Sequence, residues 1–147
     1  MMSFEDLVTK LELEKNPIVC KENKKRVEFS VNDQEFYKIH LDNNDLLPDK
    51  QTRCDYVVVY KNLKDLAIWI ELKGRHISDA CEQIKCSIKN YGEKIKNKYA
   101  VIVYSSKASP KTNDKFQRLK RELGKNLLHG SDTVKIKYDG GKVIKTN

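Results

Sequence analysis

Residues 54–73, with the sequence CDYVVVYKNLKDLAIWIELK, contain two apolar runs that decide the expected fold. The runs 54–60 and 67–73 are rich in valine, isoleucine and aromatic residues, which favour β-strands. The polar residues 61–65 between them have the composition of a turn, so the stretch predicts a β-hairpin. Both strands are apolar on both faces at their centres, which is typical of strands inside a sheet.

Three charged side chains stand at one end of this apolar hairpin. In a strand, residues two apart share a face, so Glu71 and Lys73 project together. If the hairpin register places Asp55 across from Glu71 or Lys73, two carboxylates and an ammonium meet at one point. Ions beside a dry sheet carry a large desolvation penalty unless they are paired or bound to a metal. The pattern therefore predicts a site for a hard divalent cation and an attacking water.

Such a site suits the hydrolysis of phosphodiester bonds, which needs a positioned water and neutralisation of growing negative charge. We expect Asp55 and Glu71 to hold Mg²⁺, for which Mn²⁺ can substitute, and the carbonyl of Leu72 to add a third oxygen. Lys73 is expected to orient or help deprotonate the water. Gln83, on the following helix, is expected to support Lys73 or the metal-bound water by a hydrogen bond.

The rest of the chain alternates between helical and extended patterns around this hairpin. Apolar spacing predicts helices over 4–14, 78–96 and 113–125, with Ser3 and Ser78 as candidate N-caps. Strand patterns cover 26–30, 35–42 and 99–105, and the first two are expected to form a hairpin through 31–34. A third hairpin is expected at 133–144, and loops at 21–25 and 43–52. This order predicts one α/β domain over residues 1–147, with a mixed central β-sheet flanked by helices.

Composition narrows the functional class only in part. The 147 residues are enough for one core, and the net charge of +8 favours binding to a polyanion, although a solvated lysine-rich surface explains the charge equally well. The sequence has no apolar run approaching the ~20 residues of a membrane span, and its start lacks the layout of a secretion signal, so a cytoplasmic protein is expected. The 4 cysteines lack zinc-site spacing and are expected to be free thiols.

The pattern Asp55, then Glu71-Leu72-Lys73, then a helix carrying Gln83, resembles the PD-(D/E)XK superfamily of restriction endonucleases and Holliday-junction resolvases. The resemblance covers approximately residues 26–104. Within the superfamily, the sequence is similar to a branch of small prokaryotic single-domain proteins. It implies an αβββαβ restriction-endonuclease-like core and an endonuclease that cleaves nucleic acid, with DNA as the expected substrate. Because some members of the superfamily have lost activity, an inactive nucleic-acid- or protein-binding module is the alternative.

Other assignments stay open. Asp49, in a literal Pro-Asp, competes with Asp55 for the first acid, and Asp55 is favoured because it begins a strand expected to pair with that of Glu71. Asp42 is a further candidate ligand. The resemblance to resolvases also implies an acid near the N-terminus, and the available residues are Glu5, Glu12, Glu28 and Glu35.

Basic residues after the hairpin are candidates for contact with a nucleic-acid backbone. They are Arg75, Lys85 and Lys89. Lysine and arginine on one surface bind phosphates without reading sequence, although a solvated helix face fits the same residues. A small single-domain nuclease often needs a symmetric partner to cut both strands, so a homodimer is expected.

Overall fold

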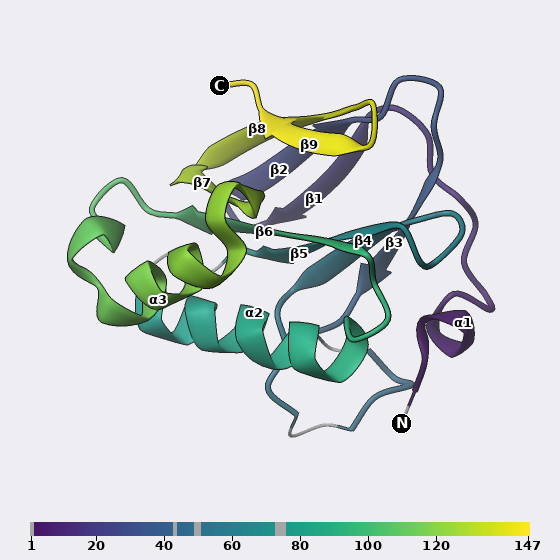
Figure 1. Ribbon diagram of the computed structural model, residues 1–147, viewed down its shortest axis with the longest axis horizontal. Helices are drawn as coiled ribbons and strands as arrows, with labels where there is room; N and C mark the ends of the chain where they lie inside the picture. The colour runs from purple at the N-terminus through teal and green to yellow at the C-terminus, as the bar shows by residue number, and fades with distance from the viewer. Residues whose placement is uncertain (1, 43, 49–50, 73–75) are drawn as a thin grey trace.

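The computed structural model describes residues 2–42, 44–48, 51–72 and 76–147, and in these residues the chain forms a mixed α/β fold with two mixed β-sheets and three α-helices. Figure 1 shows three layers, with the smaller sheet on one face of the larger sheet and helices on the other. The helices are α1 (Phe4–Leu7), α2 (Ile77–Tyr91) and α3 (Asp114–Leu123). None of the helices in the described ranges has the length and apolar character needed to cross a membrane.

The larger sheet carries the hairpin expected from residues 54–73. Its strand order is β3-β4-β5-β6-β7, in which β3, β4 and β5 are antiparallel neighbours and the pairs β5·β6 and β6·β7 are parallel. Helices α2 and α3 make the two crossover connections that parallel pairing requires. The strands are β3 (Phe36–His40), β4 (Tyr56–Tyr60), β5 (Leu66–Glu71), β6 (Asn97–Tyr104) and β7 (Leu127–Ser131).

The smaller sheet joins the two ends of the chain. Its order is β1-β2-β8-β9, and the central pair β2·β8 is parallel while the outer pairs are antiparallel. The strands are β1 (Ile18–Glu22), β2 (Lys25–Ser30), β8 (Thr133–Asp139) and β9 (Lys142–Lys145). A single central sheet was the sequence expectation, and the second sheet corrects it. The reason is that β5 and β6 are apolar on both faces, so a layer is needed on each side of the larger sheet.

The core has two parts, one on each face of the larger sheet. Between the sheet and the helices, Trp69 packs with residues of α1, α2 and α3, including Phe4 and Phe116. Between the two sheets, Ile68 and Ile70 pack against the inner residues of the smaller sheet, such as Phe29. Successive residues of β5 therefore serve opposite layers, and all six of its residues are buried.

The predicted pairing of residues 26–42 is wrong. Strand β2 pairs with β1 and β8, and β3 pairs with β4, so no hairpin joins 26–30 to 35–42. Strand β1 also occupies part of the predicted loop 21–25, with its turn at Asn23, whose φ is 55°. The alternation in residues 26–30 correctly indicates a strand with one buried face, because Val27 and Phe29 point inward, but alternation does not identify the partner strand.

Two predicted helices are longer than the helices observed. Ser3 caps α1 as expected, but the helix ends at Leu7, and Leu11 is 40% exposed. Helix α2 ends at Tyr91 and not near residue 96, and its N-cap is His76 in place of Ser78. The stop follows from Gly92, where a Cβ atom would lie 2.7 Å from both the Ile88 carbonyl oxygen and the Trp69 ring. The chain turns where only a glycine fits against the core.

The other expected elements are present. Helix α3 lies inside the predicted range 113–125 and ends at Leu123, and its C-cap is Gly124, whose φ of 59° suits a glycine. The strand predicted at 99–105 is β6, and the terminal hairpin is β8 with β9. Strand β7, which was not predicted, extends the larger sheet beside β6.

Candidate functional site

Asp55 and Glu71 lie opposite each other at the end of the hairpin. Strands β4 and β5 pair with Tyr56 opposite Ile70 and Val57 opposite Trp69, so the same register continued by one residue sets Asp55 against Glu71. Directly opposed residues of an antiparallel pair share a face, with Cβ atoms ~4.5–5.5 Å apart. That face is the one that Val57 and Trp69 present to the helices. Both acidic residues have an exposed fraction of 0%.

Within the described residues, one of the two carboxylate oxygens of Asp55 has a hydrogen-bond donor. Its Oδ2 atom accepts a hydrogen bond of 2.7 Å from the backbone N–H of Leu72. Its Oδ1 atom is buried and has no hydrogen-bond partner among the residues that the structure describes. The backbone of Asp55 is fixed as well, because its carbonyl accepts from Leu41 N–H at 2.9 Å. A buried carboxylate with an open oxygen is costly unless a cation or a donor reaches it.

The thiol of Cys54 responds to these charges. Burial raises the pKa of the Cys54 thiol far above its ordinary value, and the carboxylates of Glu71 and Asp55 raise it further. The hydrogen bond to Ser87 opposes this rise and is smaller in effect than burial. Burial is thus the main reason why the Cys54 thiol keeps its proton more firmly than an exposed thiol does.

Two side chains of helix α2 form hydrogen bonds to the ends of strands β4 and β5 that carry the acids. In the amide orientation that satisfies its neighbours, Gln83 Nε2 donates to the Glu71 carboxylate and, at 3.2 Å, to the carbonyl of Asp79. One turn later, the fully buried Ser87 accepts a hydrogen bond of 2.8 Å from the backbone N–H of Cys54. Residues four apart on a helix lie on the same face. Gln83 and Ser87 therefore connect one helix face to Glu71 and to the residue before Asp55.

Ser87 was missed by the sequence reading. It stands four residues after Gln83 on the side of α2 that packs toward the sheet, where its neighbour Ile84 is fully buried. A polar residue on the buried side of an amphipathic helix is the signal that was available. That signal does not name the partner, because the backbone of Cys54 reaches Ser87 only through the tertiary fold.

Several expected site residues fall outside the described part of the chain. These are Lys73, Arg75 and Asp49. Leu72 is described, and its backbone N–H binds Asp55, while its side chain is buried in the core between the sheets. Its carbonyl as a metal ligand stays a prediction. The backbone of Asp42 lies beside that of Asp55, because the Asp42 backbone nitrogen is 3.4 Å from the Asp55 carbonyl oxygen.

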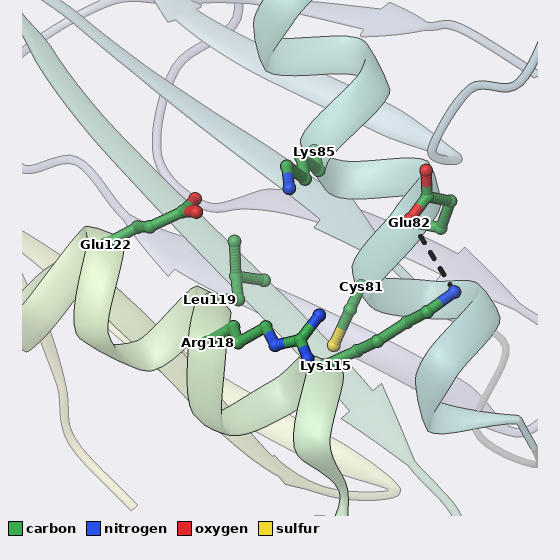
Figure 2. Close-up of a pocket in the computed structure, with 7 residues that line it drawn as sticks. All are labelled: Cys81, Glu82, Lys85, Lys115, Arg118, Leu119 and Glu122. Atoms are coloured by element: carbon green, nitrogen blue, oxygen red, sulfur yellow. Dashed lines mark ion pairs between the residues drawn. The ribbon is translucent and has the colours of Figure 1, made fainter.

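Lys85 and Lys89 do not lie beside the acids. At 100° per residue, they are turned by roughly 200° and 240° around α2 from Gln83, so they point away from it. Figure 2 shows Lys85 on a small hollow between α2 and α3, where Lys115 pairs with Glu82 at 3.7 Å. The hollow measures about 60 Å³ and has room for little more than water. Contact of these lysines with nucleic acid stays a prediction, and such contact would be made away from the acids.

The two acids that the register sets opposite each other are Asp55 and Glu71. No group of three or more histidine, cysteine, aspartate or glutamate residues is placed to hold a metal ion in the ranges that the structure describes. Glu28, one of the candidate N-terminal acids, lies on the smaller sheet and pairs with Arg26 at 3.5 Å.

Comparison with known proteins adds no relative: no protein-family model, no curated protein and no solved structure matches this chain significantly. The residues and their geometry are therefore the whole basis for a functional proposal.

Proposed function

We propose that this chain is a Mg²⁺-dependent endonuclease that hydrolyses phosphodiester bonds of nucleic acid, with DNA as the preferred substrate. One observation carries the proposal: Asp55 and Glu71 are fully buried, on neighbouring strands, in a register that sets them face to face. Two carboxylates in such a place repel each other and lack solvent. Asp55 and Glu71 would hold a divalent cation, and its charge would offset both costs.

The residues present fit Mg²⁺. This ion takes oxygen ligands and is commonly held by one or two carboxylates, with water and substrate phosphate filling the other positions. Asp55 offers its buried Oδ1 atom, and the bond from Leu72 N–H to Oδ2 keeps that carboxylate in one orientation. When bound, Mg²⁺ supplies an activated water and neutralises charge on the phosphate.

The chain's own residues then have separate roles. Asp55 and Glu71 hold the ion, and Gln83 keeps the Glu71 carboxylate in place through its amide. Ser87 holds the backbone at Cys54, and so the start of strand β4. Lys73, which lies outside the described residues, is proposed to orient the water and offset charge on the reacting phosphate. The buried sheet behind the acids excludes bulk water and strengthens these interactions.

The order of elements in the larger sheet supports the resemblance to the PD-(D/E)XK superfamily. Strands β3, β4 and β5 form an antiparallel meander, and α2 then leads to β6, parallel to β5. The αβββαβ core that the resemblance implies has the same order of three strands, helix and strand, but here β1 and β2 of the smaller sheet stand between α1 and β3. The net charge of +8 also fits a polyanionic substrate.

The proposal is tested by incubating the protein with labelled single-stranded, duplex and branched DNA and with RNA, in Mg²⁺, Mn²⁺ or EDTA. We expect metal-dependent cleavage that falls by more than about 100-fold in Asp55→Asn and Glu71→Gln, because loss of a ligand exceeds the 10–100-fold effect of losing an outer contact. Glu122→Gln, which changes an exposed acid near the end of α3, is the control. Cleavage that survives unchanged in Glu71→Gln would remove the assignment.

A second candidate is a nuclease-fold module that binds nucleic acid or protein without cutting. In the described residues no group of three or more histidine, cysteine, aspartate or glutamate residues is placed to hold a metal ion, and this observation favours it. Thermal unfolding separates the two candidates, because a bound ion stabilises the folded state. Salt-dependent DNA binding without cleavage, and with no stabilisation by Mg²⁺ or Mn²⁺, would favour the binding module.

A further inference from the structure

A polar hollow of about 430 Å³ opens at the start of α2. This volume lies within the ~300–1,000 Å³ range of ligand sites, in contrast to the hollow of about 60 Å³ in Figure 2. Its polar lining comes from two parts of the chain, the beginning of α2 and the segment that leads into α3. The polar residues are His76, Ser78, Asp79, Lys107, Ser109 and Asn113.

The hollow is built by a bond between the two helix starts. Asn113 is the N-cap of α3, where its Oδ1 atom accepts from Phe116 N–H at 3.1 Å. Its Nδ2 atom donates to the Ser78 hydroxyl in the first turn of α2 at 2.9 Å. Ser78 Oγ thus acts as an acceptor, so its own proton remains available to donate. Helices α2 and α3 begin at the same end of the molecule in Figure 1.

The chemistry of the lining favours an anion. Lys107 and Ser109 are exposed on one side and supply an ammonium and a hydroxyl. Each helix start adds a partial positive charge and N–H groups that point outward. Asp79 opposes these groups as the acidic residue of the lining, but it lies in the first turn of α2, where it also compensates the helix dipole.

The hollow adjoins the candidate site along one turn of α2. Gln83 connects them, because its amide donates both to the Glu71 carboxylate and to the carbonyl of Asp79, which lines the hollow. The hollow and the candidate site are therefore neighbours on the first turns of α2.

We infer that the hollow formed by His76, Ser78, Lys107, Ser109 and Asn113 binds a backbone phosphate of the nucleic-acid strand, next to the phosphate that is cut. The inference rests on the proposed function, because it takes the substrate of the neighbouring carboxylates as its ligand. Lys107 supplies the charge, and the hydroxyls of Ser78 and Ser109 donate to the phosphate oxygens. The contact is to the backbone, so it fixes the position of the strand and not its sequence.

The test separates binding from cleavage. Labelled single-stranded and duplex DNA are titrated by fluorescence anisotropy at several salt concentrations, using full-length protein with Glu71→Gln to prevent cutting. The added variants are Lys107→Ala and the conservative Lys107→Arg. Lys94→Ala is the matched control, because Lys94 lines a different hollow beside α1 and the end of α2.

Loss of one phosphate contact makes the dependence of log K on log salt shallower by about 0.9 for duplex and about 0.7 for single strands. We expect that change in Lys107→Ala, with little change in Lys107→Arg or Lys94→Ala. Three results would overturn the inference. The slope of log K against log salt could be the same with and without Lys107→Ala, it could change equally in Lys94→Ala, or neither DNA could bind. If Glu71-dependent cleavage occurs while Lys107→Ala has no effect, the proposed function stands and the inference fails. If the slope changes as expected and no metal supports cleavage, the binding site stands and the nuclease proposal fails.

Discussion

Asp55→Asn is the substitution that tests most directly whether the two buried acids face each other. Asparagine has the size of aspartate and keeps an oxygen that can accept a hydrogen bond from Leu72 N–H. In the unsubstituted protein this bond joins the Leu72 nitrogen to Asp55 Oδ2 at 2.7 Å. It removes one of two negative charges that have an exposed fraction of 0%. The expected result depends on whether metal is present, and its sign reverses between the two conditions.

The magnitude follows from the strand geometry. Opposed residues have Cβ atoms roughly 5 Å apart, and two unit charges at that separation repel by about 3 kcal/mol at an effective dielectric constant of 20. Replacing a charged acceptor by a neutral one weakens the bond to Leu72 N–H by about 1 kcal/mol. In EDTA, Asp55→Asn should therefore be more stable than the unsubstituted protein by about 2 kcal/mol, or about 4–8 °C in melting temperature.

Mg²⁺ should reverse that order. At a concentration 100 times its Kd, a ligand that binds only the folded state adds about 2.7 kcal/mol, and this gain should be lost in Asp55→Asn. Thermal and urea unfolding in EDTA and in Mg²⁺ measure both effects, with Asp139→Asn, an exposed acid at the end of β8, as the control. If Asp55→Asn is no more stable than the unsubstituted protein in EDTA, the two carboxylates do not repel, and the geometry argued for the site is wrong.

Three further predictions concern the supports of the site and the core. Ser87→Ala leaves the buried N–H of Cys54 without its acceptor, so the free energy of unfolding measured in urea should fall by about 1–3 kcal/mol. Metal titration should also show weaker binding. Unchanged stability would mean that Ser87 does not hold this strand. Asn113→Ala removes the cap of α3 and the hydrogen bond to Ser78, so it should lower the free energy of unfolding by about 1 kcal/mol or more. Asn113→Asp should retain the cap, and equal losses of stability in both variants would contradict this prediction. Burial raises the pKa of the Cys20 thiol to about 12, so above the ordinary value of 9.0 the unfolded chain releases a proton that the folded chain keeps. Stability should then fall with rising pH between about 9 and 12, with Cys20 contributing about 1.4 kcal/mol per pH unit, and the slope in Cys20→Ala should be shallower by that amount; identical slopes would refute it.

Local sequence determined the hairpin and the position of its acids. The runs that became β4 and β5 are rich in β-branched and aromatic residues, and a short polar turn joins them, so their pairing needed no distant partner. The same patterns identified α2, α3 and the terminal hairpin, because periodicity and capping residues act over a few positions.

Tertiary structure alone decided the second sheet, the partners of α2 and the hollow beside the site. Arg26 pairs with Thr133 in the parallel contact β2·β8, and no local period specifies a partner so far along the chain. Likewise, Ser87 reaches Cys54, and Asn113 reaches Ser78, only when separate elements pack together. Sequence pattern reports which face of an element is buried, whereas the choice of what covers that face depends on the free energy of the whole packed chain.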